Sequence, residues 1–218
     1  MQQVAFRETL LNPATVSGRF KRTIADQEVW AETEIEFEPA PKLPDSLDIS
    51  SKLPKSLPLE WREAAVSTLL DGMKTGGNWG YPLIYIKAVV TDLKGDPAKT
   101  TEAAVAGAVL DALHTLLRQG TKILEPLVRL EILAPESAIG EITGYIQARR
   151  AVIHGIDDAG SSKKLLCEVP LAEMFGFGKA LPKLSGGRAS FSMEPCGYQE
   201  ISEADLERLA SRDTRVMP

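Results

Sequence analysis

The segment LAEMFGFGKALPKLSGGRASFSMEP, residues 171–195, carries the strongest local signals of this 218-residue chain. Its glycines and Lys179 suggest a phosphate-binding loop. That loop needs Gly-x-x-x-x-Gly-Lys-Ser/Thr between a strand and a helix, because backbone N–H groups wrap the phosphates while the lysine and hydroxyl reach the terminal phosphate and Mg²⁺. Here Ala180 follows Gly178-Lys179, and no glycine lies five positions before Gly178. The segment is therefore not a P-loop.

The same segment predicts a helix over Leu171–Ala180 and a strand over Arg188–Glu194. A sheet that binds RNA stacks bases on several exposed aromatic side chains. This strand offers one such side chain, Phe191. We therefore expect Phe191 and Met193 to face a hydrophobic core instead.

The residues before this segment continue the alternation of strands and helices. Periodicity predicts a strand, a helix and two further strands, at Val128–Leu133, Pro135–Arg150, Ala151–Asp157 and Lys163–Val169. The complete order is βαββαβ, which is typical of a ferredoxin-like α+β domain with two helices on one face of an antiparallel sheet. We assign residues 123–200 to this domain and residues 201–218 to a C-terminal helical tail.

Residues 1–122 predict a first α+β unit. Expected here are a strand at 2–11, a long hairpin at 15–41, an irregular connection at 41–60, a helix from Pro58, a strand at 81–93 and a helix from Thr100 or Thr101 to Gly120. In the first helix Trp61, Ala65, Leu69 and Met73 repeat every four residues and predict its buried face.

The composition is that of a globular protein, with 44% hydrophobic and 25% charged residues. The net charge of −5 argues against binding nucleic acid mainly by neutralising phosphates, so any such contact requires local basic patches. No apolar run reaches the ~18 residues of a membrane helix, and the start lacks a signal-peptide core. We expect a soluble, cytoplasmic monomer that does not bind membranes.

Metal binding and catalysis have little support. Cys167 and Cys196 lie in strand-like segments without a CxxC motif, and His114 and His154 are isolated from each other and from both cysteines. No nucleophile, base and orienting group can be assembled from the spacing. We expect no catalytic, cofactor-binding or metal-binding residue in this chain.

A family resemblance accounts for the opening segment. VPLAEMFGFGKALPKLSGGRASFSMEPCGY, residues 169–198, resembles the last block of elongation factor G, in which V-P-L-x-E-M-F-G-Y leads to a G-R-x-S-[FY]-[ST]-M-E strand. Residues 123–156 resemble the block that begins L-L-E-P and ends in an R-R-G turn. Upstream, VAFRETL is similar to the family's opening strand, and GGNWGYPLIYIKAVV is similar to its G-x-x-G-Y-P strand.

The resemblance implies that residues 1–122 are domain IV of such a factor, of the ribosomal-protein S5 domain 2-like type, and that residues 123–200 are domain V. It implies a truncated view of a larger protein whose GTPase domain, which binds GTP and Mg²⁺, is absent. Family members place domain IV in the A site of the small ribosomal subunit during GTP-dependent translocation. Domain V lies near the base of the factor-binding stalk. The implied partners are rRNA and ribosomal proteins at these places.

The two tip loops of domain IV depart from the family pattern. RTIADQEVWAE, residues 22–32, stands where the family has a glycine-rich S-G-G-R-G-Q-Y-G-H loop. KGDPAKTTE, residues 94–102, corresponds to S-Y-H-D-V-D-S-S-E, which puts Asp96 at the position of the family's histidine. An aspartate near an RNA backbone repels phosphate or needs Mg²⁺ or a base amino group as partner.

These considerations give two sets of candidate contact residues. At the domain IV tip they are Arg22, Asp26, Lys94, Asp96 and Lys99, and in domain V they are Arg149, Arg150, Lys163, Lys164, Lys179, Lys183 and Arg188. Arg149 and Arg150 are predicted to end a helix, where cations complement the helix dipole.

Other interpretations stay open at this stage. One is a paralogue that binds the ribosome for recycling, rescue or protection without translocase activity, which the altered tip loops favour. Another is a stand-alone ferredoxin-like interaction module that uses its sheet for protein pairing.

Overall fold

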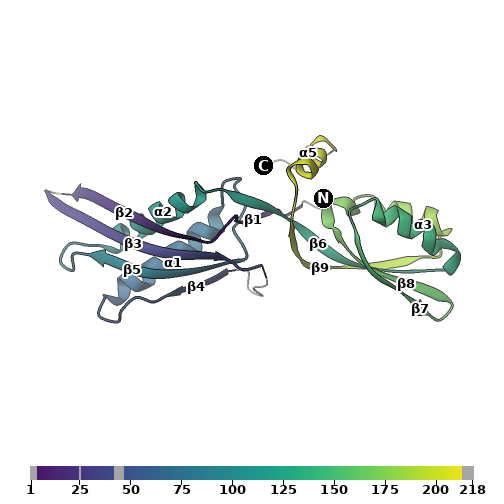
Figure 1. Cartoon of the computed structure of the whole chain (residues 1–218), viewed down its shortest axis with the longest axis horizontal. Helices are drawn as coiled ribbons and strands as arrows, with labels where there is room; N and C mark the ends of the chain where they lie inside the picture. The colour runs from purple at the N-terminus through teal and green to yellow at the C-terminus, as the bar shows by residue number, and fades with distance from the viewer. Residues whose placement is uncertain (1–3, 25, 42–46, 213–218) are drawn as a thin grey trace. The chain divides into compact units, whose positions relative to one another are not determined.

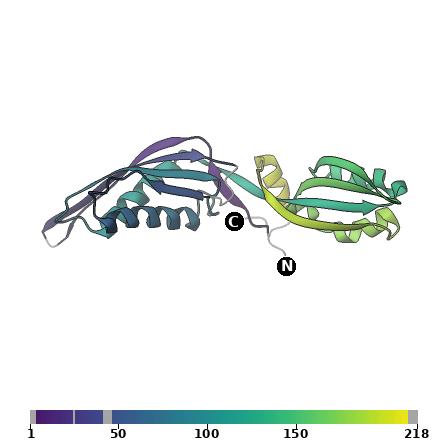
Figure 2. The same ribbon diagram turned by 90° about the horizontal axis from the view of Figure 1, so that it is seen from below.

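The computed structural model of the chain describes residues 4–24, 26–41 and 47–212. The chain divides into two compact units, one spanning residues 7–123 and the other formed by residues 4–6 together with those from Leu124 onward. Both units are mixed α+β, with a sheet covered by helices on one face, as Figures 1 and 2 show. The expected fold class of two α+β domains is confirmed.

The first unit is built on a four-stranded sheet in the order β2-β3-β5-β4. Its elements are β1 (Arg7–Leu10), β2 (Ala14–Ile24), β3 (Gln27–Pro39), β4 (Leu47–Ser51), α1 (Leu59–Thr75), β5 (Ile86–Gly95) and α2 (Glu102–Leu117). Strands β2 and β3 form the predicted hairpin, whose last pair is Ile24↔Gln27. Asp26 takes the left-handed conformation (φ 63°) that so short a turn demands.

Side chains on β3 alternate strictly, so the two faces of the sheet differ in character. Val29, Ala31, Thr33, Ile35 and Phe37 are buried beneath α1 and α2, whereas the glutamates between them point to the other face. The four predicted apolar residues of α1 are all buried. Of the two residues at which α2 was expected to begin, Thr101 is the N-cap, because its side chain accepts a hydrogen bond from the Ala104 N–H.

Helix α2 packs unusually close to strand β2. A Cβ atom added to Gly18 would lie 2.0 Å from the Ala108 carbonyl oxygen and 2.4 Å from the Ala112 nitrogen. A Cβ added to Gly107 would lie 2.2 Å from the Phe20 ring. Glycine is therefore required on both sides of this contact.

A buried carboxylate joins three segments of the first unit. Glu8 on β1 is 0% exposed. Its Oε1 accepts hydrogen bonds from the backbone N–H groups of Trp79 (2.9 Å) and Tyr81 (3.0 Å). Its Oε2 accepts one from the Thr121 hydroxyl (2.5 Å). Because a buried carboxylate without partners is strongly unfavourable, these three donors hold loop 76–82 and the start of β6 against β1.

The second unit follows the predicted order βαββαβ. Its elements are β6 (Thr121–Ala134), α3 (Glu136–Gln147), β7 (Val152–Ala159), β8 (Ser162–Pro170), a 3₁₀ turn at Leu171–Met174, α4 (Phe177–Ser185) and β9 (Ser190–Glu200), followed by α5 (Glu203–Arg212). Strand β6 lies between β8 and β9, β7 pairs with β8, and β1 is a further neighbour of β6. Ile132, Ile142, Leu165 and Phe177 are among the core residues between the sheet and α3 and α4.

Several elements differ from the sequence prediction. The helix expected at Leu171–Ala180 is a 3₁₀ turn followed by α4, because Gly176 adopts a left-handed conformation (φ 81°) that ends the first turn. The connection expected to be irregular contains β4, a short strand that pairs in parallel with β5. Strands β6 and β9 are longer than expected, since they continue pairing from Leu133↔Ser190 to Leu124↔Glu200.

The close approach of α2 and β2 generates a stability prediction. We expect Gly18→Ala to lower the free energy of unfolding by about 1–3 kcal/mol, because the added methyl group overlaps the α2 backbone. Gly140→Ala is the control, since a Cβ there meets no atom within 4 Å in α3 and should stabilise the protein by about 0.8–1 kcal/mol. Urea denaturation measures both. Equal stability of Gly18→Ala and the wild type would show that α2 can move away without loss.

Candidate functional site

The five tip candidates lie at one end of the first-unit sheet. Arg22 and Asp26 belong to the end of the β2–β3 hairpin, and both are exposed. Lys94, Asp96 and Lys99 belong to the end of β5 and the loop after it. The two regions are tied together because the Thr100 hydroxyl donates a 2.6 Å hydrogen bond to the carbonyl of Trp30 on β3.

Asp96 organises its own loop. Its Oδ1 accepts a hydrogen bond from the Ala98 N–H (2.9 Å), and its Oδ2 lies 3.6 Å from the Lys99 ammonium. Its backbone N–H donates to the Thr100 hydroxyl (2.8 Å), and its carbonyl accepts from the Thr100 N–H (2.7 Å). The carboxylate is one-third exposed and closes a turn of its own loop. The nearby Lys99 ammonium partly neutralises its charge.

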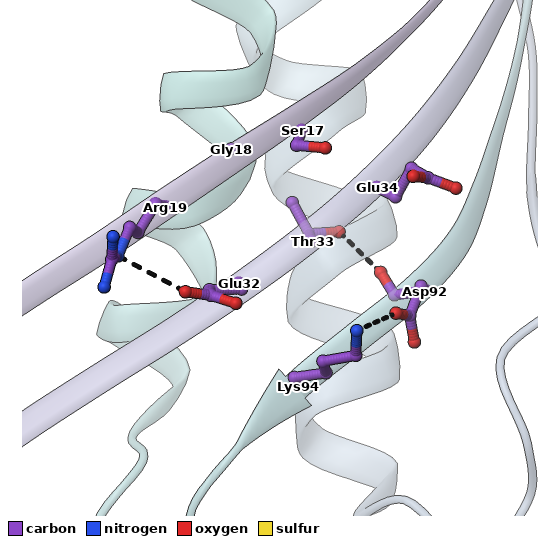
Figure 3. A pocket seen from close by; sticks show the side chains of 8 residues that line it. All are labelled: Ser17, Gly18, Arg19, Glu32, Thr33, Glu34, Asp92 and Lys94. Atoms are coloured by element: carbon purple, nitrogen blue, oxygen red, sulfur yellow. Dashed lines mark hydrogen bonds and ion pairs between the residues drawn. The ribbon is translucent and has the colours of Figure 1, made fainter.

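Beside this loop a shallow hollow of about 280 Å³ opens on the face of the sheet away from the helices (Figure 3). Its charges are paired, Arg19 on β2 with Glu32 on β3 (3.3 Å) and Lys94 with Asp92 on the same strand, β5 (3.0 Å). The hydrogen bond and charge of Asp92 raise the pKa of Lys94 above its usual value. With Glu34 the hollow holds three carboxylates and two cations, so it does not favour a phosphate.

The structure divides the seven domain V candidates into three groups. Lys179 and Lys183 lie one turn apart on α4, and Arg188 follows the glycine pair that ends this helix. All three are exposed, and among the described residues none of them forms an ion pair. We call these three residues the α4 group.

Lys163 and Lys164 form the second group, at the β7–β8 hairpin. Lys163 pairs with Asp158 (2.6 Å), and that hydrogen bond and charge raise the pKa of Lys163 and lower the pKa of Asp158. Lys164 pairs with Glu131 (2.8 Å). These two lysines therefore carry less uncompensated charge than the α4 group.

Arg149 and Arg150 form the third group and lie beyond the end of α3. Arg149 stacks on the Tyr145 ring, with its guanidinium carbon 4.5 Å from the centroid, and donates to the Glu173 carbonyl. Arg150 has a left-handed backbone (φ 59°), unusual for a non-glycine residue, and its side chain is 21% exposed. Both guanidinium groups are thus engaged within the domain.

Arg150 is the centre of a charge network. It binds both carboxylate oxygens of Glu125 (2.5 and 2.9 Å), whose side chain is 0% exposed, and it donates to Glu173 (3.0 Å), which is 5% exposed. Burial alone would lower the pKa of Arg150, but the hydrogen bonds and charges of the two glutamates raise it. Such bidentate contacts are among the stronger polar interactions in proteins.

The network also holds the C-terminal helix. Arg208 on α5 donates to Glu173 (2.7 Å) and to Asp205 (3.0 Å), and Asp205 lies 3.8 Å from Arg150. A hydrogen bond from Ser202, together with Arg150 and Arg208, lowers the pKa of Asp205. The sequence does not reveal this network, because its five charged residues are separated by up to 83 positions and show no spacing pattern.

The register places Phe191 opposite Ile132 and Met193 opposite Leu130, on the face covered by the helices. Phe191 packs edge-on against Phe177, with ring centroids 5.0 Å apart. Both therefore lie on the expected face of the sheet, but each keeps 37% exposure because β9 is an edge strand, so they lie at the margin of the core and the expectation is met only in part.

Neither cysteine forms a disulfide, and burial raises the pKa of Cys167 to about 11. Within residues 4–24, 26–41 and 47–212 no group of three or more His, Cys, Asp or Glu side chains is arranged to hold a metal ion. No helix in this same part of the chain is long and apolar enough to cross a bilayer.

The fold and the charged surfaces therefore describe a two-domain α+β chain with a projecting hairpin and a basic helix. Two family models match consecutive parts of it, "Elongation factor G, domain IV" over residues 2–121 and "Elongation factor G C-terminus" over residues 122–209. The chain belongs to the elongation factor G family, a family of translation factors.

Similar proteins agree with this assignment. Elongation factor G of Thermotoga petrophila and that of Thermotoga sp. strain RQ2 are each 30% identical over 210 residues, which is 95% of this chain and 30% of theirs. A crystal structure of a Thermus thermophilus protein superposes with a TM-score of 0.83 at 27% identity, covering 97% of this chain and 32% of that one. The chain thus spans about a third of the length of these relatives.

The Arg150 network generates the next prediction. We expect Arg150→Gln to lower the free energy of unfolding by about 3–5 kcal/mol, because it leaves the buried carboxylate of Glu125 without its cation. Arg129→Gln is the control, since Arg129 is 56% exposed and lies 3.8 Å from Glu168, so its loss should cost under about 1 kcal/mol. Urea denaturation at neutral pH distinguishes them. Similar small losses for both variants would contradict a central role for Arg150.

Proposed function

We propose that this chain is the ribosome-binding C-terminal portion of a GTP-dependent translation factor, with domain IV at residues 1–122, domain V at residues 123–200 and a helical tail at residues 201–218. The observation that carries the proposal is the uninterrupted match of residues 2–209 to two successive domains of elongation factor G. We assign GTP and Mg²⁺ binding, and hydrolysis, to parts of the parent protein outside this chain, which itself catalyses no reaction. The factor acts in the cytoplasm as a monomer.

In this proposal the first unit is an arm that enters the A site during translocation. The β2–β3 hairpin is suited to that role, because its paired strands extend past the sheet and their registered hydrogen bonds limit bending. Arg22, Lys94 and Lys99 supply cations at this end, next to the carboxylates of Asp26 and Asp96. The mixed charges favour a short-range contact over general attraction to phosphate.

The α4 group is the best candidate for an rRNA contact in the second unit. Its three cations are exposed and have no carboxylate partner in the described residues, unlike Lys163 and Lys164. Cations that neutralise phosphates release counterions, which makes binding depend steeply on salt. We retain Arg149 and Arg150 as supports of this domain and give them a lesser part in the contact.

Co-sedimentation with 70S ribosomes over a range of salt concentrations tests the proposal. We expect wild-type binding, and we expect the triple variant Lys179→Gln, Lys183→Gln, Arg188→Gln to reduce the slope of log affinity against log salt by about 0.7–0.9 per lost contact. The matched control is Lys52→Gln, Lys55→Gln, Lys87→Gln, which removes three exposed cations of the first unit that lie outside the β2–β3 hairpin. No sedimentation of wild type, or equal losses in the two triple variants, would contradict this assignment.

A second candidate function is a paralogue that binds ribosomes without promoting translocation. The geometry of Asp96 favours it, because this carboxylate closes its own loop and pairs with Lys99 at the position where the family resemblance places a histidine. A tip built in this way presents an anion to the decoding region. Recycling, rescue or protection of the ribosome would be compatible with such a tip.

Complementation of a translocase-depleted translation reaction by the full-length parent protein separates the two functions. We expect the wild type to restore repeated rounds of elongation if it is a translocase, with Asp96→His close to wild type. Binding without elongation by the wild type would establish the paralogue instead. Recovery of elongation in Asp96→His would then assign the difference to this loop.

A further inference from the structure

Loop 76–82 is held in place by hydrogen bonds and by close packing against Glu8. The Gly77 N–H donates to the Tyr81 carbonyl (2.8 Å), and the Gly80 N–H donates to the Gly77 carbonyl (3.2 Å). The Asn78 side chain donates to the Leu117 carbonyl at the end of α2 (2.7 Å). A Cβ on Gly77 would lie 2.3 Å from the Glu8 carboxylate, so the loop is packed directly on that group.

The residue at the centre of this loop is Trp79, whose indole is exposed. Its backbone N–H is bound to buried Glu8, yet its exposed fraction is 48%, against 5% for Trp61. A single exposed hydrophobic side chain is ordinary on a protein surface. What distinguishes Trp79 is that a fully buried carboxylate fixes the backbone that presents it. Because folding has already ordered this backbone, binding a partner here costs little further loss of backbone conformational entropy.

Two exposed cations lie at the helix ends beside the loop. Helices α1 and α2 both end there, with Lys74 in the last turn of α1 and Arg118 directly after α2. In the described part of the chain neither side chain forms an ion pair. The exposed carboxylates of Asp71 and Asp111 lie farther from the helix ends, three residues before Lys74 and seven before Arg118.

We propose that Trp79 is a stacking platform for an unpaired RNA base, with the adjacent phosphates bound by Lys74 and Arg118. Aromatic side chains beside cations bind single-stranded nucleic acid in this way, because every base has a face that stacks and every nucleotide carries a phosphate. An apolar protein pocket fits less well, because closing over the indole would strip water from cations that have no partner. This site uses none of the tip or α4 residues and does not depend on the translocation role.

The test measures binding of a labelled single-stranded RNA of about ten nucleotides to the whole chain by fluorescence anisotropy. We expect Trp79→Leu to raise the dissociation constant about tenfold or more and Trp79→Phe to change it much less, because phenylalanine still stacks. Leu59→Ala is the control, since Leu59 is 54% exposed at the other end of α1 and lies outside the tip, so its loss should leave RNA binding unchanged. Circular dichroism checks that each variant is folded.

Two further measurements test the proposal independently. RNA should quench indole fluorescence in Trp30→Phe, in which Trp61 is buried and Trp79 is the accessible indole. Lys74→Gln and Arg118→Gln should each lower the slope of log affinity against log salt by about 0.7. Absence of RNA binding by the wild type, or equal affinity in wild type and Trp79→Leu, overturns the proposal. Quenching that is lost in Trp30→Phe overturns it as well.

Discussion

The first unit depends on a carboxyl group that is buried away from water. Glu8 gives up its hydration in exchange for two backbone N–H groups and one hydroxyl, none of which carries a full charge. That exchange is favourable only if all three donors stay in place, so the positions of β1, loop 76–82 and Thr121 are mutually conditional. The glycine at Gly77 follows from the same requirement, because a side chain there would occupy the space of the carboxylate. The Glu8 cluster therefore links β1, the loop after α1 and the start of β6, and through Asn78 it also reaches the end of α2.

The second unit uses a charged centre of a different kind. Glu125 and Glu173 are buried beside a guanidinium whose planar donors match both carboxylates, so the pairing is strong and directional. The consequence for function is a division of labour among the basic residues. Arg150 is directed inward and supports the domain, while the cations of α4 are exposed to solvent. The net charge of −5 does not reveal this difference between buried and exposed cations, because a chain with a negative total can still have a local basic surface.

Sequence periodicity predicted the elements whose burial repeats, and it failed where structure arises from contacts distant along the chain. The four-residue repeat of Trp61 through Met73 and the alternation on β3 are local consequences of one buried face, so both were predictable. The resemblance to the family supplied the domain order and the candidate surfaces. The roles of Glu8 and Arg150 were not predictable, because their partners are brought together only by the complete fold. The segment Leu171–Ala180 forms a 3₁₀ turn and a separate helix because Gly176 adopts a left-handed conformation. A glycine permits this conformation but does not require it, so the break could not be predicted.

Strand β4 bears on the order in which the first unit folds. It pairs in parallel with β5, and the whole of α1 lies between the two strands. Parallel neighbours cannot be joined by a tight turn, so this pairing closes a long stretch of chain and gains little until α1 is packed. The β2–β3 hairpin needs no such closure. The long hairpin should therefore form early and the pairing of β4 with β5 late. The strand that docks last is then an internal segment of the unit's sequence and not one of its ends.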